Sequence, residues 1–128
     1  MSQTTNSFKA GDVVLGAFAT ANGQILNHYS VVLTANSGGC VLVYTTSLKE
    51  HSTCSQRFTA ADMMLANWSK PCRWDASNVS IVPNDKIRKT GSISKATLNA
   101  IRQAHQRALE SRTVHRAMLT PAGEVVTA

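Results

Sequence analysis

Three stretches rich in β-branched residues, separated by short turns, constrain the fold of this chain more than any other feature of its sequence. They cover residues 12–18 (DVVLGAF), 25–35 (ILNHYSVVLTA) and 40–46 (CVLVYTT). Between them lie Ala21-Asn22-Gly23 and Asn36-Ser37-Gly38-Gly39, both strong turn sequences. Connections this short leave no room for helical crossovers, so we expect the strands to pair antiparallel in sequence order. The pattern predicts a mainly β fold that curls into a small closed or half-open barrel.

The segments that follow give weaker patterns. Residues 48–57 are polar and predict a long surface loop, a feature often associated with function. Residues 59–62 have the spacing of a helix capping box and predict a short helical turn through Leu65. Residues 71–75 and 78–82 predict two further short strands, because Pro71 is tolerated at the start or edge of a strand.

The clearest helix follows Gly91. Ser92 or Ser94 supplies its N-cap, and apolar residues recur at helical spacing from Leu98 to Leu109. Residues 1–7 are polar and predict a disordered leader, whereas residues 113–128 have no period and are expected to fray or to serve as a linker. The predicted organisation is therefore a leader (1–7), one domain (8–112) and a C-terminal tail (113–128).

Charge and cysteine content narrow the function classes. The 13 Lys and Arg residues exceed the 7 Asp and Glu residues, and the formal charge of +6 favours an anionic partner such as nucleic acid, although a solvated helix face would look the same. Three cysteines without CxxC spacing, and with no secretory signal before them, argue against a disulfide framework or zinc site and favour a reducing cytoplasm. No apolar run approaches the roughly 18–20 residues that cross a bilayer. We expect a cytoplasmic protein with no metal, no cofactor and no membrane span.

The order of four short motifs resembles that of the PemK/MazF family of toxins. The resemblance runs over roughly residues 9–109 and implies a half-open SH3-like β-barrel with a C-terminal helix, an α+β fold that is mainly β. It also implies a homodimer, a cognate antitoxin protein and metal-independent cleavage of single-stranded RNA, in which the ribose 2′-hydroxyl attacks the adjacent phosphorus and leaves a cyclic phosphate and a 5′-hydroxyl end. The motifs are Gly11-Asp12-Val13-Val14, Tyr44-Thr45-Thr46-Ser47, Lys70-Pro71-Cys72-Arg73-Trp74-Asp75, and Gly91-Ser92-Ile93-Ser94 followed by Leu98 and Ile101.

One segment departs from the family's pattern. Where the family has Arg-Pro at the head of its second core strand, this chain has Asn27-His28-Tyr29-Ser30. His28 falls about where that arginine would sit, and an imidazole can act as an acid or as a phosphate ligand. A half-buried strand histidine that bonds a neighbour explains the residue equally well.

Arg73 and Asp75 are the leading catalytic candidates. They stand two apart on a predicted strand, so their side chains leave the same face and can converge on one phosphate. The resemblance makes Asp75 the predicted general base and Arg73 the predicted transition-state stabiliser and candidate proton donor. His28 is the better proton donor, because histidine exchanges protons near neutral pH. A same-face surface ion pair is the alternative explanation for Arg73 and Asp75.

Hydroxyl groups and one loop residue complete the predicted site. Thr46 is a catalytic candidate because its hydroxyl can donate to the phosphate or to the base. Ser47, Thr45 and His51 are predicted to bind the substrate, with His51 in the long polar loop.

Three further residues and two rival functions stay open. Trp68 and Trp74 can stack on unpaired bases, but Trp74 should point away from Arg73 and Asp75, toward the core or a dimer contact. Cys72 beside Arg73 invites a nucleophile hypothesis, although a small buried residue is the simpler explanation. One rival function is a non-catalytic nucleic-acid- or protein-binding module in which the missing Arg-Pro marks loss of chemistry. The other is a gyrase-directed toxin, since a related toxin family uses a similar barrel.

Overall fold

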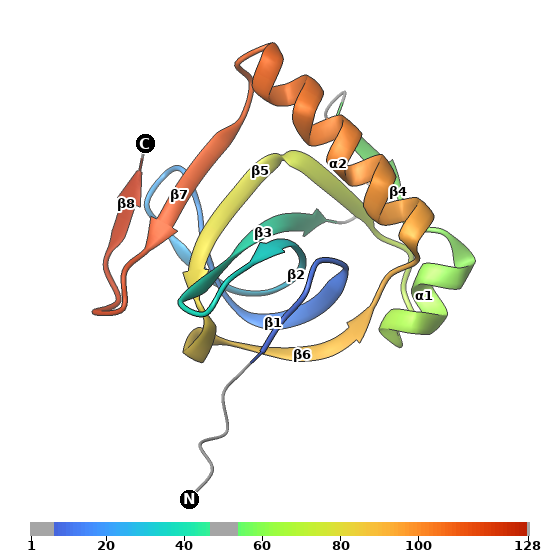
Figure 1. Ribbon diagram of the computed structural model, residues 1–128, viewed down its shortest axis with the longest axis horizontal. Helices are drawn as coiled ribbons and strands as arrows, with labels where there is room; N and C mark the ends of the chain where they lie inside the picture. Colours follow the sequence, from blue (N-terminus) through green and yellow to red (C-terminus); the bar gives the residue numbers. More distant parts are fainter. Residues whose placement is uncertain (1–6, 47–53, 128) are drawn as a thin grey trace, which may run out of the picture.

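The computed structural model describes residues 7–46 and 54–127, and within them the chain forms a strongly curved eight-stranded sheet with two α-helices packed outside it (Figure 1). The strand order is β6-β1-β2-β3-β5-β7-β8, and β4 pairs with β5 off this path. The predicted α+β, mainly β class is confirmed. The elements are β1 (Asp12–Ala19), β2 (Ile25–Ala35), β3 (Gly39–Thr46), β4 (Ser55–Arg57), α1 (Ala60–Ala66), β5 (Arg73–Pro83), the 3-10 turn η1 (Asn84–Lys86), β6 (Ile87–Ser92), α2 (Lys95–Glu110), β7 (His115–Leu119) and β8 (Val125–Thr127).

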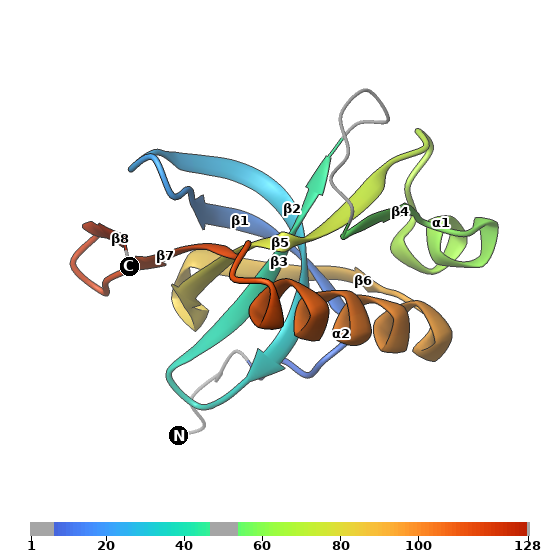
Figure 2. The ribbon, with the colours of Figure 1, turned by 90° about the horizontal axis from the view of Figure 1, so that it is seen from above.

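Strands β1, β2 and β3 form the antiparallel meander that the turn spacing predicts. Their valines are buried on both faces of the sheet: Val31 and Val32 are neighbours in the chain, yet each is fully buried in a different apolar cluster. The cluster that contains Val31 lies under α2 and includes Ile101 and Ala104. The sheet therefore curves around one cluster, and α2 covers the other. Figure 2 shows α2 from above, lying along one side of the sheet.

Strand β5 corrects the prediction of two short strands, because residues 73–83 form one continuous strand that pairs with β3. The register slips within it: Val43 faces Val79, whereas the next residue, Tyr44, faces Asp75. The side chain of Asp75 accepts hydrogen bonds from the Ser77 backbone and hydroxyl inside this irregular stretch. A local side-chain hydrogen bond of this kind stabilises a β-bulge. The bulge interrupts the alternating pattern of the strand, which is why the sequence predicted two strands here.

Strand β4 corrects part of the predicted loop. Residues 55–57 pair antiparallel with the start of β5, with Ser55 opposite Asp75 and Arg57 opposite Arg73. The substrate-binding candidate Ser47 lies outside the described residues. So do the first part of the predicted loop, which holds the candidate His51, and residues 1–6 of the predicted leader.

One buried aspartate joins the two helices. Thr59 caps α1 and forms a capping box with Asp62, as predicted, and Ser94 caps α2. The Asp62 carboxylate also accepts from the Ser94 backbone N–H at 2.8 Å and from the Thr97 hydroxyl at 2.5 Å. The two helix N-termini therefore share one anion. In the part of the chain that the structure describes, no helix is both long and apolar enough to cross a membrane.

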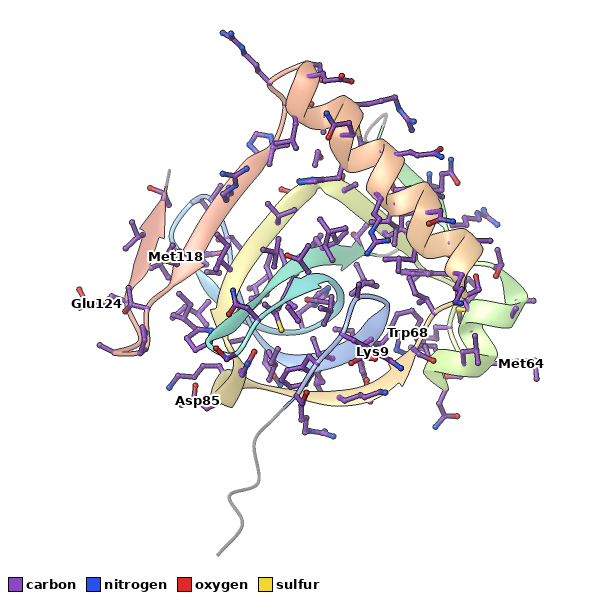
Figure 3. The ribbon with its side chains drawn as sticks, viewed as in Figure 1. Lys9, Met64, Trp68, Asp85, Met118 and Glu124 are labelled. Atoms are coloured by element: carbon purple, nitrogen blue, oxygen red, sulfur yellow. The ribbon has the colours of Figure 1, made fainter. Side chains whose placement is uncertain are left out.

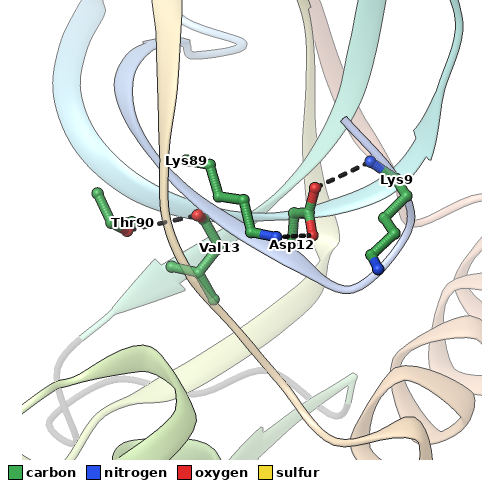
Figure 4. Close-up of polar contacts among 5 residues, drawn as sticks. All are labelled: Lys9, Asp12, Val13, Lys89 and Thr90. Atoms are coloured by element: carbon green, nitrogen blue, oxygen red, sulfur yellow. Dashed lines mark hydrogen bonds and ion pairs between the residues drawn. The ribbon is translucent and has the colours of Figure 1, made fainter. Parts of the chain in front are cut away.

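A second buried aspartate, Asp12, ties the start of the barrel together (Figure 4). One of its oxygens accepts from the Lys9 backbone at 2.9 Å, and the other forms an ion pair with the Lys89 ammonium of β6 at 3.2 Å. The Gly-Asp-Val-Val motif thus has a structural role, because it locks β1 to β6.

The segment after α2 corrects the expectation of a fraying tail. Strand β7 pairs parallel with β5 and buries Ala117 and Leu119, and β8 folds back on β7. Only two of the five residues of β7 are buried, so the segment carries too little periodicity to be recognised before its neighbour β5 is in place. Figures 1 and 2 show this hairpin at the opposite end of the molecule from α1. The boundaries predicted for the domain and its tail stay a prediction.

Candidate functional site

Strand register places three of the polar candidates, together with a further arginine, on one face of the sheet. Thr46 of β3 lies opposite Arg73 of β5, and Arg57 of β4 lies opposite the same arginine on its other side. Directly paired residues project from the same face, so these three side chains form a line across three strands. His28 extends it, because Ser30 faces Tyr44 and His28 stands two residues before Ser30. We call His28, Thr46, Arg73 and Arg57 the cationic row.

His28 is held in a defined orientation. Its ring stacks on Tyr44, with centroids 4.7 Å apart and planes 14° from parallel, and its Nε2 lies 2.5 Å from the carbonyl oxygen of Thr45. A carbonyl only accepts hydrogen bonds, so Nε2 carries the proton and the lone pair of the neutral ring is on Nδ1. A half-buried strand histidine is expected to bond to a neighbour, and the bond to Thr45 is of that kind. It leaves the lone pair of Nδ1 free to accept a proton.

Arg73 is oriented by β4. Its Nε donates to the Ser55 hydroxyl at 3.0 Å and one terminal nitrogen donates to the Ser55 carbonyl at 3.1 Å. A guanidinium has five N–H donors, so donors remain for a ligand after these two bonds. The half-buried side chain is thus fixed in position with its charge still usable.

The two leading candidates do not converge on each other. Whereas Arg73 bonds Ser55, the carboxylate of Asp75 accepts from the Ser77 backbone at 3.0 Å, the Ser77 hydroxyl at 2.6 Å and the Asn78 amide at 2.7 Å. Asp75 is only 9% exposed, and both of its oxygens are engaged. These contacts give Asp75 a clear structural task in holding the bulge of β5, and its role as general base stays a prediction.

The two threonines of the third strand point to opposite faces. Thr46 is half-buried in the cationic row, whereas Thr45 is 4% exposed and its hydroxyl donates to the Tyr29 carbonyl at 2.8 Å. Thr45 therefore bridges β2 and β3, although it also lines a pocket on its own face of the sheet.

Cys72 and Cys40 are poorly suited to nucleophilic chemistry. Burial raises the pKa of the Cys72 thiol to about 11, and burial together with the nearby Asp12 charge raises the pKa of Cys40 to about 11. Both thiols are protonated at neutral pH, so Cys72 does not behave as the activated nucleophile that its neighbour Arg73 suggested. Among the residues that the structure describes, no cluster of three or more His, Cys, Asp or Glu side chains has the arrangement of a metal site.

Comparison with known proteins bears on the fold. No protein-family model and no curated protein sequence matches this chain. A solved structure of an endoribonuclease from Mycobacterial species, in complex with its cognate antitoxin, superposes with a TM-score of 0.61 at 17% identity, covering 81% of this chain and 96% of that chain. A second endoribonuclease from Mycobacterial species gives a TM-score of 0.60 at 16% identity, covering 84% of this chain and 96% of the other. The chain therefore shares the fold of these two solved endoribonucleases.

On this endoribonuclease fold, the structure adds residues that sequence reasoning missed. Arg57 was missed because residues 48–57 had no strand pattern. The role of Tyr44 was missed because it stacks on His28 of the neighbouring strand, a contact that the sequence of one strand does not reveal. Ser77 and Asn78 carried a usable signal, since polar residues two and three positions after an aspartate are typical of an Asx turn. A pocket on the opposite face of the strand ends was not foreseen at all. It is lined by His28, Tyr29, Thr45, Asn67, Trp68, Ser69, Lys70 and Cys72.

Proposed function

We propose that this protein is a metal-independent endoribonuclease of the PemK/MazF type that cleaves single-stranded RNA. The observation that carries the proposal is the pairing of Arg57 with Arg73. Like charges directly opposite each other on neighbouring strands destabilise a sheet, and a bound phosphate between them would remove that repulsion. The overall charge of +6 and the endoribonuclease fold of the two similar structures support the same conclusion.

The cationic row supplies the groups that RNA cleavage by 2′-hydroxyl attack requires. Nδ1 of His28 takes the proton of the ribose 2′-hydroxyl, whose oxygen then bonds to the adjacent phosphorus while the bond from phosphorus to the 5′-oxygen breaks. Arg73 and Arg57 stabilise the added negative charge of the phosphorane, and Thr46 donates a hydrogen bond to a phosphoryl oxygen. The departing 5′-oxygen takes a proton from water. DNA lacks the attacking hydroxyl and is not a substrate.

Asp75 belongs to this site as a positioning residue. Because its carboxylate organises Ser77 and Asn78, it fixes the bulge that sets β5 against Tyr44, the residue on which His28 stacks. The variant Asp75→Asn separates this role from that of a general base. An amide oxygen still accepts from Ser77, so positioning predicts most of the activity retained, whereas a general base predicts its loss.

The partners proposed for the protein follow from the fold. One of the two similar structures was solved with its cognate antitoxin, and we propose an antitoxin protein as the partner that covers the cationic row here. A homodimer is part of the same proposal, since pairing two such rows would lengthen the basic surface available to RNA.

The deciding experiment is incubation of purified protein with a long single-stranded RNA in EDTA, followed by mapping of the fragment ends. We expect discrete cuts with 5′-hydroxyl ends, reduced at least about 100-fold in Arg73→Ala and in His28→Ala. Arg57→Ala should lower the rate as well, while Arg102→Ala, which removes an exposed arginine of α2, is the matched control and should cut normally.

Two outcomes would refute the nuclease. RNA that is bound and stays intact would favour the non-catalytic binding module, and intact RNA together with inhibited DNA supercoiling would favour the gyrase-directed toxin.

A further inference from the structure

The pocket on the opposite face of the strand ends has the form of a nucleobase site. Its volume is about 350 Å³. Its walls include the aromatic rings of Tyr29 and Trp68, together with Lys70 and His28. Base-sized pockets in proteins have this mixture of apolar walls and a few polar groups. Because His28 and the Thr45–Thr46 strand end adjoin both this pocket and the cationic row, a strand of RNA whose phosphate lies on the row has a neighbouring base within reach of the pocket.

Tyr29 and Trp68 form the stacking surface. Tyr29 is 38% exposed although the next residue of its strand, Ser30, is buried, and its ring meets Trp68 edge to face with centroids 5.7 Å apart. Trp68 packs in turn on Phe58, with centroids 5.0 Å apart, just after the end of α1 (Figure 3). The Tyr29 ring is therefore held at a right angle to a fixed neighbour while one side is available to a base.

The indole N–H of Trp68 is the second, independent sign of a ligand. Nε1 is shielded from solvent and has no hydrogen-bond partner among the described residues. An unsatisfied buried donor is rare in folded proteins, because it loses its bond to water and gains nothing in return. A base that enters the pocket with a carbonyl oxygen at this ring edge would supply the missing acceptor.

Three further polar groups of the pocket can donate hydrogen bonds. Lys70 contributes an ammonium, Ser69 a hydroxyl, and Cys72 a thiol that burial keeps protonated by raising its pKa to about 11. The Thr45 hydroxyl donates its hydrogen to the Tyr29 carbonyl, so toward the pocket its oxygen can only accept. A site rich in donors selects ligand edges that carry oxygen acceptors.

We infer that this pocket binds an unpaired nucleobase with an exocyclic carbonyl oxygen, such as uracil, in preference to adenine, which has none. The base stacks on Tyr29, its carbonyl accepts from Nε1 of Trp68, and the Lys70 ammonium lies beside the sugar–phosphate backbone. The inference rests on the proposed function, because it assigns to the pocket the base next to the phosphate that is cleaved. It makes Tyr29 and Trp68 specificity-determining residues.

The test uses short DNA strands, which carry bases but lack the 2′-hydroxyl, so binding is read whether or not the protein cuts RNA. Hexathymidylate, hexadeoxyadenylate and a hexamer of abasic sites are titrated against the protein while tryptophan fluorescence is followed. Trp74 is 1% exposed and provides a constant background, so quenching reports on Trp68. We expect the thymidylate to bind about tenfold more tightly than the adenylate and the abasic strand to bind most weakly.

Two variants make the test specific. Trp68→Phe keeps a ring against Phe58 and Tyr29 but removes the N–H, and it should reduce the preference for thymidylate to about twofold or less while leaving abasic binding unchanged. Tyr29→Ala should weaken both base-bearing strands about tenfold. Circular dichroism confirms that each variant is folded before its binding is interpreted.

The outcomes separate this inference from the proposed nuclease. Equal binding of the two base-bearing strands, no binding of any strand, or a preference unchanged in Trp68→Phe would overturn the base site, even if RNA is cut. Intact RNA together with a Trp68-dependent thymidylate preference would leave the base site standing and remove the nuclease.

Discussion

Removing the Asp62 carboxylate should be among the most damaging single changes in this protein. Asp62 is fully buried and accepts four hydrogen bonds, from the backbone and hydroxyl of Thr59, from the Ser94 backbone and from the Thr97 hydroxyl. In Asp62→Ala the two hydroxyls can rotate toward other acceptors, but the two backbone N–H groups cannot. Each stranded N–H costs about 1–3 kcal/mol, so we expect a loss of about 4 kcal/mol in the free energy of unfolding.

Urea denaturation followed by circular dichroism at pH 7 measures this loss, and thermal unfolding should show a midpoint lower by about 15 °C, at roughly 4 °C for each kcal/mol. Asp62→Asn keeps one oxygen but points an N–H₂ group at the donors, so it should lose about half as much. A change below about 1 kcal/mol in Asp62→Ala would show that the carboxylate does not hold the two helices together.

The same residue predicts a dependence on pH. Burial by itself raises the pKa of Asp62, but the hydrogen bonds from Thr97, Ser94 and Thr59 outweigh it, and the pKa lies below its usual value. A lowered folded-state pKa stabilises the protein above the unfolded value of about 3.9, and this stability is lost as the pH falls from there through the folded value. The difference between wild type and Asp62→Ala should therefore be full at pH 7 and shrink below about pH 4. A difference that stays constant down to pH 3 would contradict the reasoning.

Three further perturbations test the packing and the site. Gly91→Ala places a Cβ 2.7 Å from the Ala66 Cα and 2.8 Å from the Leu65 carbonyl oxygen, both backbone atoms, so α1 must shift from β6 at a cost of about 1–3 kcal/mol in urea denaturation. Gly38→Ala, whose Cβ would meet only the Asn36 side-chain oxygen at 3.5 Å, is the control for added bulk and should cost less. Lys89→Met leaves the 1% exposed Asp12 without its ion-pair partner and should lower the free energy of unfolding by about 1–2 kcal/mol. High salt should reproduce part of this loss in wild type, because the Lys89 side chain is 49% exposed. The raised pKa of Cys72 predicts that iodoacetamide at pH 7.5 leaves this thiol unmodified in the folded protein, which mass spectrometry can measure. The variant Cys72→Ser should still cut RNA. Rapid alkylation of Cys72 would reopen the nucleophile hypothesis.

The candidate site shows how far the sequence alone can lead. Spacing along one strand predicted that Arg73 and Asp75 share a face, and the register agrees. Spacing did not predict that the two side chains bond to different partners. Arg73 donates to Ser55, which the pairing of β4 with β5 places beside it, and Asp75 accepts from Asn78 across the bulge in β5. The pKa of the Cys72 thiol likewise could not be predicted from the sequence, because burial in the folded protein determines it and the adjacent Arg73 does not.

The features that could be predicted from the sequence are those that depend on local interactions. The β1–β2–β3 meander, the capping box at Thr59 and the helix behind Ser94 depend on turns, caps and periodicity within about a dozen residues, where the chain's own chemistry restricts the outcome. The resemblance of four ordered motifs added the barrel and its helix, and the similar structures agree with that fold.

The features that join distant segments depend on the folded arrangement of the whole chain. The parallel pairing of β7 with β5, the short strand β4 and the line from His28 to Arg57 bring together residues far apart in the chain. Each of these segments is too short, or too polar, to show a pattern of its own. Such strands form because an existing edge offers unpaired N–H and C=O groups, and that edge exists only after the barrel has closed.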